Sequence, residues 1–266
     1  MTDDEGGNGD LITMSKYLTN LNRIEFVMTY ACTGKCKHCS EGEKLSCGDK
    51  IDGAVAAEMI KAVCKSYEIK TLMTFGGEPL LAIDEVCLIH KTATEFNIPK
   101  RQLITNGYFS KDENVITETA QRLSESGVND VLLSVDAFHQ ETIPTETVKL
   151  FAEALLKENV PVRLSPAWLV GKSDNNPYNV KTVEVLKIFK DMGIPESDGN
   201  VIFPEGNARI YLKEYFDLTK PYINPYSEEP QNVKTLSVSP NGDVLDGNLY
   251  KNSITEIIKS YKGTSI

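Results

Sequence analysis

The sequence lacks the features of several protein classes. Basic residues are outnumbered by acidic ones, 28 to 38, which gives a formal net charge of −10, and an acidic surface repels nucleic-acid phosphate and anionic lipid headgroups. No apolar run is long enough to span a bilayer. Residues 1–10 are acidic and glycine-rich and contain no apolar stretch of a secretory signal. The sequence therefore predicts a cytoplasmic protein that binds neither nucleic acid nor membrane.

Cysteine is absent from the chain after Cys87, and all six cysteines lie at or before that residue. In a cytosolic protein such residues are more often thiols or metal ligands than disulfides. A cysteine-ligated metal must therefore lie near the N-terminal part. Cys64 and Cys87 fall on the apolar stripes of expected helices, which favours a role as small core residues. Cys47 lies in a polar loop, where a surface thiol and an active-site position are both open.

Short β-branched runs alternate with amphipathic segments of helical period. The expected strands are 24–29, 71–75, 102–105, 130–135, 160–164 and 200–203, and the expected helices are 53–67, 82–96, 112–126, 145–158 and 180–192. Such alternation, with nearly continuous apolar strands, predicts a parallel α/β fold. The strands fall short of a complete barrel, so a partial barrel and a doubly wound sheet both remain open.

Polar residues follow or end each expected strand, where parallel α/β folds collect their chemistry. These residues comprise a cysteine loop at 30–39, Gly76-Gly77-Glu78-Pro79, Thr105-Asn106-Gly107, Ser134 with Asp136, Arg163 with Ser165, and Pro204-Glu205-Gly206-Asn207-Ala208-Arg209. Because residues at i and i+2 of a strand share a face, we expect Ser134 and Asp136 to point to the same side.

Three cysteines within eight residues, spaced C-x3-C-x2-C, give the strongest signal. Three thiolates without a fourth in register suit a [4Fe-4S] cluster with one open iron. A structural zinc site is the alternative, and it needs four closed ligands. His38 or Cys47 could supply the fourth, although His38 adjoins Cys39 directly. Thiols without a metal are the third reading.

The C-x3-C-x2-C loop after a first strand, together with Gly76-Gly77-Glu78-Pro79 after a second, resembles the radical S-adenosylmethionine (SAM) enzymes over roughly residues 24–210. The resemblance implies a partial (β/α)6 TIM-like barrel of parallel strands. It implies a [4Fe-4S] cluster whose open iron is chelated by SAM, and anaerobic chemistry started by an electron donor such as flavodoxin or ferredoxin. Cleavage of SAM then yields a 5′-deoxyadenosyl radical that abstracts hydrogen from a substrate.

The resemblance also implies roles for individual residues. The expected cluster ligands are Cys32, Cys36 and Cys39. The expected SAM contacts are Gly76, Gly77 and Glu78 at the amino group, Ser134 and Asp136 at the ribose, Arg163 at the carboxylate, and, with a lesser role, Thr105 and Asn106. Two residues are candidate substrate contacts, His139 and Trp168, with core packing the default for Trp168.

The tail resembles the start of the SPASM/twitch extension, which normally binds auxiliary clusters through cysteines. Where such a cysteine would follow Val244, the chain has Leu245 and Asp246. We therefore expect a flexible acidic segment at 1–20, a radical SAM core domain at 21–215 and a cluster-free SPASM/twitch remnant at 216–266. The remnant is expected to contain a strand, a turn and a short helix.

The SPASM-like tail favours modification of a peptide, by crosslinking or epimerisation. A small-molecule metabolite as substrate and a glycyl-radical activase remain open. A non-catalytic zinc or iron–sulfur binding module is the alternative from another class of protein.

Overall fold

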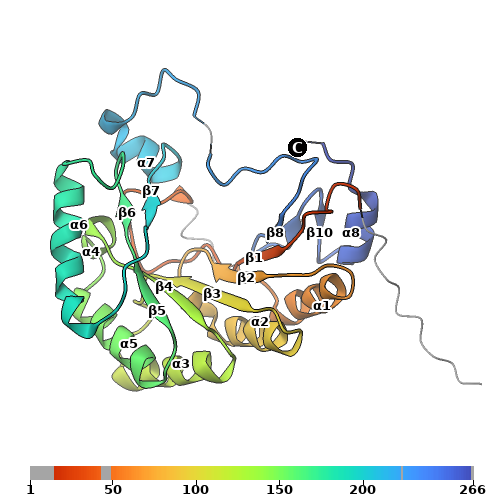
Figure 1. Cartoon of the computed structure of the whole chain (residues 1–266), viewed down its shortest axis with the longest axis horizontal. Coiled ribbons are helices and arrows are strands. Elements are labelled where there is room, and N and C mark those ends of the chain that lie inside the picture. The colour runs from red at the N-terminus through yellow and green to blue at the C-terminus, as the bar shows by residue number, and fades with distance from the viewer. Residues whose placement is uncertain (1–14, 43–48, 223, 265–266) are drawn as a thin grey trace, which may run out of the picture.

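The computed structural model describes residues 15–42, 49–222 and 224–264, and it shows an α/β fold. Six parallel strands form one sheet in the order β5-β4-β3-β2-β1-β8, and the elements follow an open arc with β8 near one end and β6 and β7 near the other (Figure 1). The expectation of a parallel, partial-barrel architecture is confirmed.

The secondary structure follows the expected alternation closely. The strands are β1 (Arg23–Val27), β2 (Thr71–Phe75), β3 (Lys100–Thr105), β4 (Asp130–Ser134), β5 (Val162–Ser165), β6 (Ala167–Trp168), β7 (Asn200–Val201), β8 (Thr235–Val238), β9 (Asp243–Val244) and β10 (Gly247–Asn248). The helices are α1 (Gly53–Cys64), α2 (Ile83–Glu95), α3 (Glu113–Glu125), α4 (Ala137–Gln140), α5 (Thr145–Lys157), α6 (Pro177–Ile188), α7 (Gly206–Tyr211) and α8 (Ile254–Ser260), with short 3-10 turns η2 (Pro79–Ala82), η3 (Lys190–Met192) and η4 (Lys213–Tyr215).

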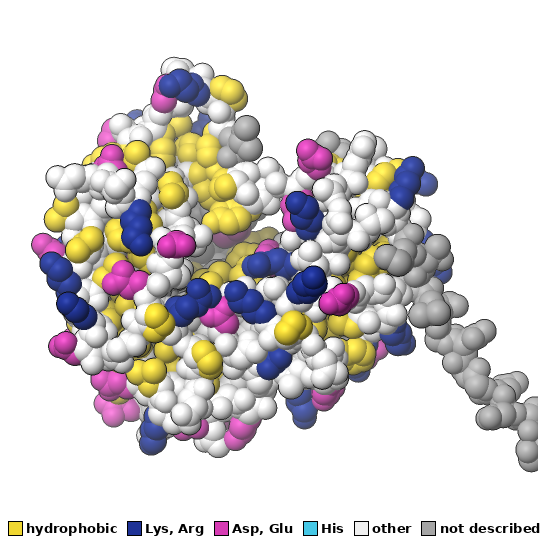
Figure 2. Space-filling model, viewed as in Figure 1, with side chains coloured by type: hydrophobic (Ala, Val, Ile, Leu, Met, Phe, Trp, Pro, Cys, Tyr) yellow, Lys and Arg dark blue, Asp and Glu magenta, His cyan; other side chains and the backbone are white. Residues whose placement is uncertain are grey.

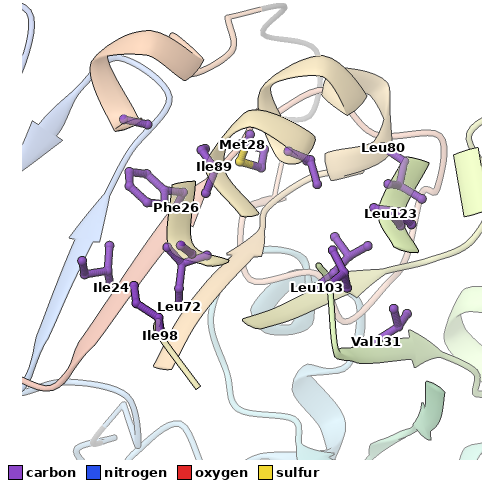
Figure 3. Packing of buried hydrophobic residues seen from close by; sticks show 14 of the residues in the cluster. Ile24, Phe26, Met28, Leu72, Leu80, Ile89, Ile98, Leu103, Leu123 and Val131 are labelled. Carbon is purple, nitrogen blue, oxygen red and sulfur yellow. The ribbon is translucent and has the colours of Figure 1, made fainter. Parts of the chain in front are cut away.

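Helices cover the outer face of the sheet with apolar side chains. Ile24, Phe26 and Leu72 on the strands lie in one buried cluster with Ile89 of α2 and Leu123 of α3 (Figure 3). Each of these side chains is fully buried, and complete burial of one such side chain contributes about 1.5–3 kcal/mol. The outer face of the sheet is therefore the hydrophobic core.

Side chains alternate along each strand, so the residues between the core positions point to the opposite, inner face. Several of these inner residues are polar. Glu25 of β1 aligns with Met73 of β2, Met73 with Gln102 of β3, and Gln102 with Asp130 of β4. Parallel sheets are usually apolar on both faces. This polar row therefore distinguishes the inside of the arc from the core.

The expected strand at 200–203 does not join the main sheet. Only Asn200 and Val201 form a strand, β7, which pairs with β6 in a separate two-stranded sheet. The sixth strand of the main sheet is instead β8, whose residues Thr235–Val238 pair in parallel with β1. The partner of a strand depends on its position in the tertiary structure, and hydrophobic periodicity in the sequence does not predict that position.

The C-terminal segment has the expected strand, turn and helix. After β8, the antiparallel strands β9 and β10 form a hairpin. Helix α8 begins at a capping box in which Ser253 and Glu256 satisfy each other's backbone N–H groups. Its residues Ile254, Ile257 and Ile258 are buried. The segment therefore packs at the β8 end of the sheet.

Among the described residues, no helix has both the length and the apolar composition that a membrane crossing requires.

Candidate functional site

The cysteine loop follows β1 and is held against the Gly76-Gly77-Glu78 turn that follows β2. The Gly77 N–H donates to the Thr29 carbonyl and the Glu78 N–H donates to the Ala31 carbonyl, both at 2.8 Å. A Cβ at position 77 would lie 2.1 Å from the Ala31 oxygen. Only glycine permits this approach, so the turn fixes the start of the cysteine loop.

The far end of the cysteine loop is held by the start of α7. The Asn207 N–H donates to the Cys39 carbonyl at 2.9 Å, and its side-chain Nδ2 donates to the Cys36 carbonyl at 3.1 Å. Gly206 has φ +51, and a Cβ there would lie 2.3 Å from the Ser40 oxygen. No individual role was predicted for Asn207, and its signal in the sequence is its place in the polar segment 204–209 that follows an expected strand.

The three thiols share a desolvated environment. Burial raises the pKa of Cys32 to about 11 and also raises the pKa of Cys36 and of Cys39. The Cys32 sulfur accepts from the Gly34 N–H at 3.3 Å. Thiols in such surroundings ionise when a metal centre compensates the charge. The donor set therefore fits a metal cluster, with a backbone N–H already directed at one ligand sulfur.

Glu78 is completely buried and connects three segments. Its Oε1 accepts from the Thr105 hydroxyl at 2.7 Å and from the Leu80 N–H at 3.0 Å, and its Oε2 accepts from the Asn106 N–H at 2.9 Å. Burial raises the pKa of Glu78 to about 7, against the effect of these donors. The carboxylate is thus internal, and it fixes the loop after β3 to the turn after β2.

Asn106 links the Glu78 network to the cysteine loop. Its Oδ1 accepts from the Tyr108 N–H at 2.8 Å, which fixes the orientation of the amide. Its Nδ2 then lies 3.5 Å from the Cys32 sulfur and 3.2 Å from the Thr33 hydroxyl. Asn106 therefore adjoins the cysteine loop directly, whereas Thr105 is connected to it through Glu78.

Asp136 is fully buried at the end of β4. Its Oδ1 accepts from the N–H groups of Phe138 and His139, and its Oδ2 accepts from the Ala167 N–H at 3.0 Å and lies 2.8 Å from His139 Nδ1. Burial opposes its ionisation, but the charge and hydrogen bond of His139 lower the pKa of Asp136 to about 2. Both oxygens are engaged within the chain, and the contact of Asp136 with the ribose stays a prediction.

His139 in turn packs against His38, the residue before Cys39. The two rings lie 4.8 Å apart in an edge-on arrangement, and the Phe138 ring lies 5.0 Å from His38. Desolvation lowers the pKa of His38 to about 4. Within the described part of the chain, the His38 Nδ1 atom is buried and has no hydrogen-bond partner. The predicted His139 thus contacts the cysteine loop through His38.

The geometry for a single metal ion differs from the predicted ligand set. Over the described ranges, the group of donor atoms close enough to share one ion comprises Cys36, His38 and His139, within 4.8 Å of one another. Cys32 and Cys39 are not part of it. A zinc site of the three cysteines with His38 is therefore not the arrangement present, and Cys47 lies outside the described residues. A multi-iron cluster spans more widely separated thiols.

Two predicted site residues lie elsewhere. The Arg163 guanidinium forms a two-pronged ion pair with Asp130, with distances of 2.9 and 2.7 Å. The Nε atom and one terminal nitrogen of Arg163 are thus engaged within the sheet, and its contact with the SAM carboxylate stays a prediction. Trp168 is 3% exposed, belongs to the core and donates to the Asp198 carbonyl. Trp168 therefore packs in the core, which was the default expectation for this residue.

Ser134 and Ser165 are neighbours at the same level of β4 and β5. Each is 9% exposed, and neither hydroxyl makes a hydrogen bond to another described residue. Both lie on the inner face, which Ser134 shares with Asp136 as its spacing predicts.

The two cysteines on the expected helices lie apart from these groups. Cys64 packs at the margin of the core, and Cys87 donates weakly to the Arg122 carbonyl at 3.7 Å.

The site agrees with comparisons to known proteins. Residues 26–218 match the family model of the radical SAM superfamily. A probable GTP 3′,8-cyclase of Saccharolobus islandicus is 25% identical over 248 residues, which cover 91% of this chain and 75% of the relative. A GTP 3′,8-cyclase of Desulforamulus reducens is 24% identical over 196 residues, covering 66% of this chain and 58% of the relative.

Solved structures share the fold. The structure of anSMEcpe with bound AdoMet superposes with a TM-score of 0.59 and 18% identity, covering 91% of this chain and 81% of the other. The same protein with AdoMet and the Cp18Cys peptide gives a TM-score of 0.57, also with 18% identity, covering 90% and 80%.

The chain belongs to the radical SAM superfamily. It is therefore an enzyme, and its cofactors are a [4Fe-4S] cluster and SAM, as expected from the cysteine loop and the Gly-Gly-Glu turn.

Proposed function

We propose that Cys32, Cys36 and Cys39 ligate the [4Fe-4S] cluster. Support comes from one loop that is fixed at both ends, at Thr29 and Ala31 by the Gly77 turn and at Cys39 by Asn207. A rigid loop holds three sulfurs in place before the cluster forms, which reduces the conformational entropy lost on assembly.

We infer that SAM binds beside this loop at the carboxyl ends of the strands. The backbone of Gly76 and Gly77, the amide of Asn106 and the hydroxyls of Ser134 and Ser165 are the groups that would hold it. The Glu78 carboxylate supports that surface from below, since its oxygens accept from Leu80, Thr105 and Asn106. Held by these residues, the cluster and SAM would supply the radical chemistry that removes a hydrogen atom from the substrate.

For the substrate, we propose a small metabolite that enters the inside of the arc. The relatives named GTP 3′,8-cyclase support a small molecule, and the inner face of the sheet carries the polar side chains Glu25, Gln102 and Asp130 beside apolar ones.

Modification of a peptide, by crosslinking or epimerisation, is the second candidate. It is supported by the tail at 216–266, which we propose as a cluster-free SPASM/twitch remnant beside a core domain at 21–215, and by the peptide bound to anSMEcpe. Flavodoxin or ferredoxin is the proposed electron donor in either case.

The ligand assignment is tested by replacing Cys36 with Ala and reconstituting the protein anaerobically with iron and sulfide. The variant should lose the brown colour, the cluster absorbance and the cleavage of SAM to 5′-deoxyadenosine. Cys64→Ala is the matched control, because Cys64 is a partly buried thiol at the edge of the core, and it should keep all three. Cleavage of SAM by the Cys36→Ala variant would refute the assignment.

Replacing Glu78 with Gln separates SAM binding from cluster binding. The amide keeps the size of the side chain, but its NH₂ group replaces an oxygen that accepted a hydrogen bond in the wild type. Iron content should remain at the wild-type level while the affinity for SAM falls. Equal SAM affinity in the two proteins would show that the Glu78 network does not support that surface.

A further inference from the structure

Along the strands, the side chains on the inner face of the main sheet change from hydroxyl to apolar to charged. Towards the carboxyl ends lie Ser134 and Ser165, paired across β4 and β5. Below them, the apolar side chains Val27, Phe75, Ile104 and Leu132 are all partly exposed. Val27 aligns with Phe75 and Ile104 with Leu132, so these residues form a middle band.

The amino ends of the same strands carry a charged band. Arg23 and Glu25 of β1 form an ion pair. Asp130 of β4 accepts from Arg163 at 2.7 Å and from Gln102 at 2.7 Å, and it lies 3.4 Å from the Lys100 Nζ. Arg23 and Lys100 occupy the same level, since both align with Thr71.

Exposure differs between the two signs of charge. The side chains of Arg23, Lys100 and Arg163 are 32%, 49% and 36% exposed, whereas those of Glu25 and Asp130 are 19% and 12% exposed. The carboxylates lie beneath the cations and orient them. The accessible surface of the band is therefore cationic, in a chain whose net charge is −10.

The molecule is hollowed at the centre of the face seen in Figure 2, and Lys and Arg side chains gather along the margin of the hollow. If the cations served only to stabilise the fold, each would be expected to have its own carboxylate. Here a single carboxylate, Asp130, is shared by Lys100 and Arg163, so positive charge is in excess. Concentrated positive charge at the mouth of a hollow attracts anions.

We propose that this cationic band, formed by Arg23, Lys100 and Arg163, binds an anionic group of the substrate. Gly76 lies five residue steps after Thr71, a rise of roughly 17 Å along a strand. The substrate would then be elongated, with a phosphate or carboxylate at the amino ends of the strands and its reacting carbon near the cysteine loop. The inference rests on the proposed function, because the same inner face receives the substrate.

The experiment measures binding of two anions to the full-length, cluster-loaded protein by titration calorimetry. The probes are inorganic pyrophosphate for phosphate and glutarate for carboxylate. The test variant is Lys100→Gln, which leaves Asp130 paired with Arg163 and Gln102. The control is Lys61→Gln, since Lys61 is 40% exposed and paired with Glu58 on the outer helix α1. Thermal unfolding verifies that each variant is folded.

Saturable binding that Lys100→Gln weakens about tenfold, the loss expected for one charge-assisted hydrogen bond, supports the proposal, while Lys61→Gln binds as wild type. Tighter pyrophosphate assigns a phosphate, and tighter glutarate assigns a carboxylate. Should Lys100→Gln misfold, Arg23→Gln serves as the second variant. Absence of saturable binding to the wild type, or equal binding by test and control variants, overturns it. SAM cleavage by the wild type is assayed separately, so failure of the proposed function is recognised independently.

Discussion

The Nδ1 atom of His139 lies 2.8 Å from Oδ2 of Asp136, inside the protein at the end of β4. The same carboxylate accepts backbone N–H groups from Phe138, His139 and Ala167. One side chain therefore caps α4, fixes the start of β6 and orients the ring that packs against His38. Asp136 acts on the cysteine loop as a positioning residue.

Replacing Asp136 with Asn should lower the free energy of unfolding by about 2–4 kcal/mol, because a buried acceptor of several donors becomes a partial donor. Denaturant unfolding of the reconstituted protein measures the change. Asp112→Asn is the control, since Asp112 is an exposed helix cap that accepts from Asn114, and its cost should stay below about 1 kcal/mol. Similar losses in the two variants would contradict the role given to Asp136.

Gly77→Ala should prevent stable assembly of the cysteine loop. The added Cβ would lie 2.1 Å from the Ala31 carbonyl oxygen, and the nearest atoms that it would meet, in Tyr30 and Ala31, belong to the backbone. We expect iron incorporation to fall severely and stability to drop by about 3 kcal/mol or more. Gly171→Ala has no atom within 4 Å of the new Cβ and should bind iron normally. Normal iron content in Gly77→Ala would show that the cysteine loop assembles without close contact between Gly77 and Ala31.

Asn106→Ala should lower the reduction potential of the cluster. The Asn106 amide points its Nδ2 at the Cys32 sulfur, 3.5 Å away, and hydrogen bonds to ligand sulfurs stabilise the more negative, reduced state. A spectroelectrochemical titration under anaerobic conditions measures the potential. Thr117→Ala, on the exposed face of α3, should leave it unchanged. A potential identical to wild type in Asn106→Ala would exclude this hydrogen bond from the tuning of the cluster.

His90 should make the stability depend on pH. It is completely buried beside Thr74, and burial lowers the pKa of His90 from 6.5 to about 3. Between these values the unfolded chain binds the proton and the folded chain does not, so stability falls as the pH drops below 6.5. From about pH 7 to about pH 5, this residue should cost about 2 kcal/mol.

The measurement compares denaturant unfolding of wild type and His90→Gln at both pH values. Gln keeps a polar atom near Thr74 but does not titrate in this range. The wild type should lose about 2 kcal/mol more than the variant over the interval. Parallel losses would show that His90 is protonated without cost in the folded protein.

Local features were predictable because their causes are local. The apolar stripes of α1 and α2 and the cap at Asp52 arise from residues within a few positions of one another. The helices accordingly lie within a few residues of their expected ranges. The strand at 200–203 was wrong in extent, since only Asn200 and Val201 form β7, which pairs with β6, while β8 takes the edge beside β1.

The roles of charged residues were less predictable. Arg163 shares a face with Ser165, as its spacing indicates, yet its partner Asp130 lies 33 positions earlier and on a neighbouring strand. Strand register alone brings the two together. Asp136 was likewise expected to bind a ligand, but the chain folds its own N–H groups around both oxygens.

The sequence by itself determined the class of chemistry. The spacing of Cys32, Cys36 and Cys39 and the Gly76-Gly77-Glu78 turn identify the superfamily, since a cluster loop and a close backbone approach each need specific residues in a short segment. Only the tertiary structure decided which polar groups are already satisfied and which remain accessible. Those partners come from distant strands and loops, and Coulomb and hydrogen-bond energies depend on separation in space rather than along the chain.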